Sequence, residues 1–212
     1  MTAYDNYGQG EVAFSAAGLF AASYLNVQSL VPYLTILDTL GTEVGSPISL
    51  PAATAGSYGG TFVSVAGTSQ GFVAVYNGTS PSNKVASLLA TYVSDSSVGD
   101  AGVSDGGDIA TTPVGATHAY TGGYAFSGVW GARGSSDGIG AGFAVLYLDG
   151  SVSFLYFGGD GSTRTSPQAV LQQANAASGG DEVNLTNYGG TFAVSLYSSA
   201  EHLTRMVASS CQ

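Results

Sequence analysis

The chain has 212 residues, of which four are Lys or Arg and fourteen are Asp or Glu, so its formal net charge is −10. With so few cations there is no basic patch to neutralise phosphates, which excludes a nucleic-acid-binding protein. Hydrophobic residues make up 44% of the chain and charged residues only 8%. This balance predicts one folded domain with a sizeable core.

The N-terminal segment MTAYDNYGQGE lacks the basic and apolar stretches of a signal peptide. The most apolar stretch, residues 16–40, alternates apolar and polar residues, so we expect no membrane span. Cys211 is the only cysteine, which excludes an intrachain disulfide and leaves pairing between molecules open. Asn77 and Asn184 each begin an Asn-x-Thr glycosylation sequon.

One pattern recurs along the chain: a Phe is followed four residues later by Tyr or Trp, inside an apolar run that follows a glycine turn. The copies lie at residues 20–24, 72–76 and 126–130, with an altered copy at 192–197. An alternating run precedes each turn, which is typical of a β-hairpin. The copies predict four repeats of about 52 residues, at approximately 8–58, 59–113, 114–165 and 180–212.

A further apolar run follows each hairpin, and the first repeat has a fourth candidate strand at residues 46–51. Three or four antiparallel strands per repeat predict an all-β fold, a β-propeller of four repeats that close into a ring. Residues 1–7 are expected to add an outer strand to the last repeat and so close the ring. The alternatives are a slice of a larger propeller or a β-sandwich.

Three segments depart from the simple repeat. Residues 166–178 have a Ser cap, a Pro at the first helical position and a terminal Gly, which predicts a short inserted helix. Residues 85–92 are expected to form a strand because of their place in the repeat. Residues 99–113 and 132–140 are rich in Gly, Asp and Ser, which favours loops.

The string Gly-Phe-Val-Ala-Val-Tyr at residues 71–76 and the Asp-x-x-Gly turn at 38–41 carry a resemblance. They are similar to the repeat of secreted bacterial β-propeller proteins of the myxobacterial type, and the similarity covers most of the chain. Only Trp130 keeps the tryptophan of that repeat, and the second repeat has Asp95-Ser-Ser-Val98 in place of Asp-x-x-Gly. The resemblance implies a secreted adhesion or recognition protein.

No catalytic residue is predicted. The Gly-x-Ser-x-Gly pattern at residues 67–71 joins two expected strands, whereas a nucleophile elbow needs a strand followed by a helix. His118 and His202 are the only histidines, which leaves few ways to build a catalytic triad. The run Ser135-Ser-Asp-Gly-Ile139 lacks the final glycine of a sialidase Asp box, and the fourteen acids select no carboxylate pair.

Four aspartates cluster in one Gly-rich segment: Asp95, Asp100, Asp105 and Asp108. Carboxylates are ligands for calcium, but this spacing does not match a calcium-binding loop. We therefore expect a solvated turn, with no cofactor and calcium as the weaker alternative.

The four ring positions of the repeat are the candidate ligand-binding residues: Tyr24, Tyr76, Trp130 and Tyr197. Rings repeated around a symmetric scaffold suit stacking on sugars or aromatic ligands. Residues four apart on a strand share a face, so each ring also lies beside the Phe of its copy. Packing between neighbouring repeats is the favoured role and a ligand platform the alternative.

Together these features favour a non-enzymatic extracellular recognition or adhesion module that binds carbohydrate or a partner protein. The first alternative is a structural subunit of an extracellular fibre, layer or appendage, which would form homo-oligomers. The second alternative is a polysaccharide-active enzyme.

Overall fold

The computed structural model describes residues 10–26, 31–50, 62–79, 86–95, 110–113 and 129–210, and these residues form four antiparallel β-sheets. The first sheet contains β1 (Glu11–Phe14), β2 (Phe20–Asn26), β3 (Val31–Leu37) and β4 (Ile48–Ser49). The second contains β5 (Val63–Gly67), β6 (Gly71–Thr79), β7 (Ala86–Ser94) and β8 (Ala110–Pro113). The third contains β9 (Val129–Ser136), β10 (Ala141–Tyr147), β11 (Ser151–Phe157) and β12 (Thr163–Gln172). The fourth contains β13 (Glu182–Tyr188), β14 (Thr191–Ser198) and β15 (Leu203–Ser210).

Within each sheet the strands follow one another in chain order, as expected for consecutive hairpins. The all-β prediction is therefore confirmed, as are the strands expected at 46–51 and 85–92. No helix long and apolar enough to cross a membrane occurs among the residues that the structure describes.

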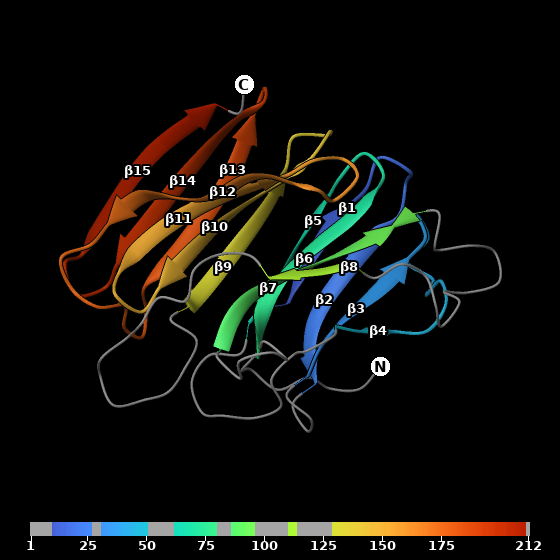
Figure 1. Cartoon of the computed structure of the whole chain (residues 1–212), viewed down its shortest axis with the longest axis horizontal. Helices are drawn as coiled ribbons and strands as arrows, with labels where there is room; N and C mark the ends of the chain where they lie inside the picture. The colour runs from blue at the N-terminus through green and yellow to red at the C-terminus, as the bar shows by residue number, and fades with distance from the viewer. Residues whose placement is uncertain are drawn as a thin grey trace.

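The sheets stand in a row, in chain order (Figure 1). The first strand of each sheet is its innermost, and these strands contact one another in sequence: β1 with β5, β5 with β9, and β9 with β13. Separate apolar clusters fill the three gaps between neighbouring sheets. The first and fourth sheets lie at the two ends, so the row is open and not the expected closed ring (Figure 1). Residues 1–7, expected to close the ring, lie outside the described residues.

The aromatic repeat marks the second strand of each sheet, but its third copy was placed incorrectly. Phe20, Phe72 and Phe192 lie on β2, β6 and β14. The matching second strand of the third sheet is β10, which carries Phe143 and, four residues later, Tyr147. The sheet runs from Val129 to Gln172, not over residues 114–165, because residues 142–149 form its second strand rather than its third.

The helix expected at residues 166–178 is also wrong. Residues 163–172 form β12, an edge strand that pairs with β11. The pairing is irregular around Pro167: Phe154 lies opposite Gln168 and Tyr156 opposite Thr165. An edge strand with a bulge tolerates a proline that donates no hydrogen bond. Because Val170 and Leu171 pack against the core between the third and fourth sheets, tertiary packing outweighs the local helix signals.

Of the two expected loops, residues 132–140 contain most of β9, and residues 110–113 of the other form β8. The glycines of β9 are explained by close packing rather than by a loop. A Cβ on Gly134 would lie 2.9 Å from the carbonyl oxygen of Val65 and 2.8 Å from the ring of Phe143. Glycine in a strand permits such close approach of two sheets.

Candidate functional site

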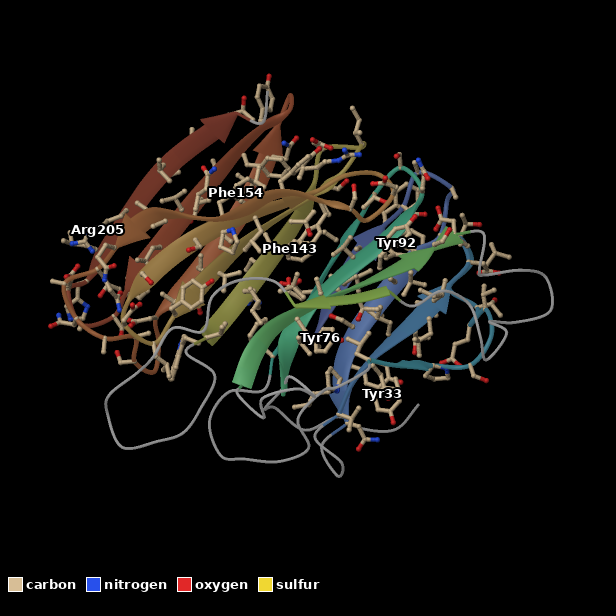
Figure 2. The ribbon with its side chains drawn as sticks, in the orientation of Figure 1. Tyr33, Tyr76, Tyr92, Phe143, Phe154 and Arg205 are labelled. Carbon is tan, nitrogen blue, oxygen red and sulfur yellow. The ribbon has the colours of Figure 1, made fainter. Side chains whose placement is uncertain are left out.

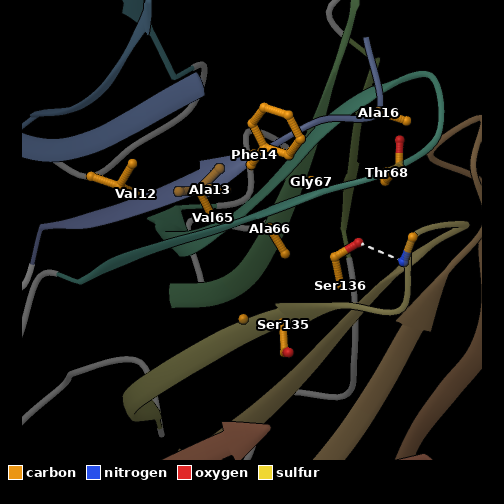
Figure 3. A pocket seen from close by; sticks show the side chains of 12 residues that line it. Val12, Ala13, Phe14, Ala16, Val65, Ala66, Gly67, Thr68, Ser135 and Ser136 are labelled. Carbon is orange, nitrogen blue, oxygen red and sulfur yellow. Dashed lines mark hydrogen bonds between the residues drawn. The ribbon is translucent and has the colours of Figure 1, made fainter. Parts of the chain in front are cut away.

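A groove of about 460 Å³ lies where the innermost strands of the first three sheets meet (Figure 3). Segments of β1, β5 and β9 and the turns after them form its walls. The lining residues are Val12, Ala13, Phe14, Ala16, Val65, Ala66, Gly67, Thr68, Gly134, Ser135, Ser136 and Gly138. Volumes of this size are typical of small-molecule sites.

The first and second sheets approach each other closely beside the groove, where residue 67 is a glycine. A Cβ on Gly67 would lie 1.8 Å from the carbonyl oxygen of Phe14, which is closer than any real contact. Glycine at position 67 therefore lets β5 pass directly against β1. The small residues of its lining leave the groove open above the contact, and the ring of Phe14 stands at its edge, 54% exposed.

The chemistry of the groove is uncharged. It combines one exposed aromatic ring with three hydroxyl-bearing residues, Thr68, Ser135 and Ser136, and it includes no acidic or basic residue. The hydroxyl of Thr68 donates a hydrogen bond to the carbonyl of Gly159 at 2.8 Å, which links the second sheet to the third. Ser136 accepts a hydrogen bond from the N–H of Gly138, as Figure 3 shows. Such a lining favours a neutral, polar ligand with one apolar face.

A partly buried ion pair joins the same three strands. Arg133 of β9 donates a hydrogen bond from Nη1 to Oε1 of Glu11 on β1, at 3.2 Å. The other carboxylate oxygen accepts hydrogen bonds from the Ser64 hydroxyl and from the backbone N–H of Val65 at 3.0 Å. Burial raises the pKa of Glu11, against the lowering effects of Ser64, Arg133 and Val65.

Both oxygens of the Glu11 carboxylate are thus engaged, and the side chain is only 15% exposed. The described residues contain no cluster of three or more His, Cys, Asp or Glu that would hold a metal ion. The geometry makes the Glu11 carboxylate a clamp between sheets rather than an acid or base for catalysis. Sequence reasoning missed this pair because Arg133 falls in the Gly- and Ser-rich run that predicted a loop.

The four predicted ring positions do not form one platform. Tyr76 is fully buried between the first and second sheets, where its hydroxyl shares a 2.8 Å hydrogen bond with Thr91 (Figure 2). Trp130, on β9, packs against the core between the third and fourth sheets. These two rings have the packing role that sequence analysis favoured.

The other two rings lie at opposite ends of the row. Tyr24 stacks on Tyr33 of the neighbouring strand, with ring centroids 5.7 Å apart and planes 12° apart. Tyr197 lies on the outward side of the fourth sheet and is 38% exposed. Tyr24 and Tyr197 are therefore on separate surfaces, neither of which is the groove.

The other sequence motifs have structural roles or fall outside the described residues. Ser69 sits in the turn between β5 and β6 of the second sheet, whereas His202 is in the turn between β14 and β15 of the fourth. Asp137 caps its own turn: Oδ1 accepts from the N–H groups of Ile139 and Gly140, and Oδ2 from the Tyr156 hydroxyl at 2.6 Å.

His118, Cys211 and three of the four clustered aspartates, Asp100, Asp105 and Asp108, lie outside the described residues, so the calcium alternative stays a prediction. The Asn184 sequon lies on the exposed side of β13.

Comparison with known proteins assigns no family. No family model matches the chain, and no curated protein matches it. Among solved structures, it is similar to the crystal structure of a subtype N11 neuraminidase-like protein of A/flat-faced bat/Peru/033/2010 (H18N11). The TM-score is 0.39 and the sequence identity 9%, over 93% of this chain and 51% of that one. The chain thus spans about half the length of this neighbour, and its resemblance to secreted bacterial propellers stays a prediction.

Proposed function

We propose that the chain is a non-enzymatic recognition module that acts outside the cell and binds a neutral carbohydrate in the groove between β1, β5 and β9. The observation that carries this proposal is the lining of the groove: an exposed phenylalanine ring beside hydroxyls and glycines, with no ionisable side chain. A sugar has an apolar ring face that suits stacking on Phe14 and hydroxyls that suit hydrogen bonds to Ser135 and Ser136.

The acids near the groove support binding rather than hydrolysis. A glycosidase needs two carboxylates that face the scissile bond, one as acid and one as base or nucleophile. Glu11 is held in the clamp with Arg133 and Ser64, and Asp137 caps a turn. No carboxylate lines the groove in the described part of the chain.

We also propose that the row of sheets is a segment of a β-propeller. In a propeller the first strand of each blade lies nearest the axis, and ligands bind where these strands converge. The contacts of β1 with β5 and of β5 with β9 have this arrangement, and the groove lies at the convergence. The open row supports a slice of a larger ring over a closed ring of four.

A glycan array followed by titration calorimetry tests the carbohydrate proposal. Phe14→Ala removes the exposed ring and should weaken binding about tenfold, since an aromatic contact contributes about 1 kcal/mol. Leu40→Ala is the matched control, because Leu40 is also exposed but does not line the groove. No binding to any glycan, or equal binding by wild type and Phe14→Ala, would refute the assignment of the groove.

Release of reducing ends from polysaccharides by the purified chain would overturn the non-enzymatic part of the proposal. Surface protease treatment of intact source cells tests the location, since an extracellular protein should be digested while cytoplasmic markers persist.

A further inference from the structure

The outward side of the first sheet is an uncharged surface that no described sheet covers. We call it the leading face and define it by Phe20, Ala22 and Tyr24 of β2 and Tyr33, Thr35 and Leu37 of β3. Thr35 is 7% exposed and the other five residues are half-buried. The register pairs Phe20 with Leu37, Ala22 with Thr35 and Tyr24 with Tyr33, so these six residues share one side. The alternate residues, such as Ala21 and Leu34, are buried in the cluster shared with the second sheet.

The second sheet has nearly the same residues at the equivalent positions. Its side facing the first sheet consists of Phe72, Ala74 and Tyr76 of β6 and Leu89, Thr91 and Val93 of β7, paired in the same register. Phe, Ala, Tyr and Thr are identical at four of the six positions, whereas Leu37 corresponds to Val93 and Tyr33 to Leu89. All six side chains of the second sheet are at most 2% exposed. The leading face thus repeats a surface that is fully buried one sheet further along.

The other end of the row has the complementary surface. We call the outward side of the fourth sheet the trailing face and define it by Ala193 and Ser195 of β14 and Met206 and Ala208 of β15. The register pairs Ala193 with Ala208 and Ser195 with Met206.

The trailing face resembles the side of the first sheet that packs on the second. There, Ala21 and Ser23 occupy the positions that Ala193 and Ser195 occupy in the fourth sheet, and Leu34 corresponds to Met206. Ala21, Ser23 and Leu34 are all buried in the existing interface. The two outward faces therefore resemble both halves of the interface between the first and second sheets, except that Ala208 stands where the first sheet has the buried Ile36.

We propose that a second copy of this chain docks head to tail, with its trailing face on the leading face of the first, and so continues the row of sheets. The residues that define the two faces include no charged residue, whereas Glu182 of β13 lies beside the trailing face, opposite Tyr197. The contact joins two different surfaces, so repetition closes a ring or extends a filament. The leading face adjoins the groove, because the ring of Phe14 lies on the same side of the first sheet as Phe20, with ring centroids 5.1 Å apart.

Sedimentation velocity of the full chain over a wide concentration range tests the proposal, and the wild-type mass should rise with concentration. Ala22→Glu places a charge on the leading face and Ser195→Glu one on the trailing face. Each change should weaken association about a hundredfold or more, because a carboxylate would be buried without a partner. Ala176→Glu, in the exposed turn before β13, is the control and should associate like wild type.

Mixing the two variants gives the decisive result. Each variant keeps one intact face, so an equimolar mixture should form a dimer and stop there, although each variant alone is monomeric. Circular dichroism and thermal melting establish that both variants fold, and Ser195→Glu, on an outward and partly exposed side, remains informative if Ala22→Glu does not.

Three outcomes would overturn the proposal. A wild type that is monomeric at every concentration shows that no second copy docks. Association of Ser195→Glu like that of the wild type shows that the trailing face takes no part. A mixture of the variants that stays monomeric shows that the two faces do not bind each other. Ser195 is on the fourth sheet and does not line the groove, so glycan titration of Ser195→Glu tests the proposed function separately.

Discussion

Replacement of Asp181 by Asn should loosen the fourth sheet. Asp181 lies just before β13 and is 6% exposed. Its Oδ1 accepts hydrogen bonds from the backbone N–H and the hydroxyl of Ser199, both at 2.7 Å. Its Oδ2 accepts from the N–H of Ser178 at 2.7 Å and from Nε2 of Gln173 at 3.0 Å. An amide turns one of these acceptors into a donor that faces other donors.

The magnitude follows from the acidity of this carboxyl. Burial alone would raise the pKa of Asp181, but the hydrogen bonds from Gln173, Ser199 and Ser178 outweigh burial and lower the pKa from 3.8 to about 2. A shift of this size corresponds to about 2 kcal/mol of folding free energy at neutral pH. Because the pKa of Asp181 is lower in the folded state than in the unfolded state, this stabilisation is present above pH 3.8 and is lost as the pH falls toward about 2.

Urea unfolding followed by tryptophan fluorescence measures the effect. Trp130 is the only tryptophan and packs against the core between the third and fourth sheets, so its emission reports that junction. Asp181→Asn should lower the free energy of unfolding by about 2 kcal/mol at neutral pH, and the deficit should shrink in acid. Asp160→Asn, in an exposed turn, is the control and should change stability far less. A deficit that is absent at neutral pH, or that stays constant into acid, would refute the reasoning.

Three further substitutions test individual contacts of the first and second sheets. Gly67→Ala should destabilise the fold by about 3 kcal/mol, because the new Cβ would meet the backbone of Phe14; an unchanged melting temperature would contradict the close approach of the strands. Tyr76→Phe should cost about 1–3 kcal/mol in urea unfolding, since it leaves the buried Thr91 hydroxyl without its partner, and a neutral effect would argue against that hydrogen bond. Burial raises the pKa of Glu11 above 4.5, so the stability of the wild type should decline as the pH rises from 4.5 to the raised pKa of the folded state. Glu11→Gln should abolish that decline in a series of urea titrations at different pH values. A variant that keeps the wild-type pH profile would assign the decline to another group.

The sequence predicted the parts of the fold that depend on a repeated local signal. Phe20, Phe72 and Phe192 each follow a tight turn in an alternating run, and each lies on the second strand of its sheet. The third copy was misplaced because Phe126 and Trp130 have the same spacing as the true pair, Phe143 and Tyr147. Spacing alone does not show which of two neighbouring apolar runs forms the second strand of a sheet.

The remaining errors have one physical origin, which is that contacts between sheets override local preference. Pro167 follows a serine as in a helix cap, yet this segment joins an edge strand whose neighbours bury Val170 and Leu171. The glycines of β9 indicated a loop, although they serve the close contact of the second and third sheets. The groove was not foreseen because its lining comes from three segments that are far apart in the chain.

In the open row the main contacts of each sheet are with its immediate neighbours. The folding of one sheet is therefore coupled mainly to the folding of the sheets next to it, as in a repeat protein. Loss of the fourth sheet at the end would leave the contacts between the first and second sheets intact. A defect in the second sheet would remove the main contacts between the two sides of the row and leave the Glu11–Arg133 ion pair between the first and third sheets. Gain or loss of a terminal unit by gene duplication or deletion would therefore change the length of the row without any redesign of its middle.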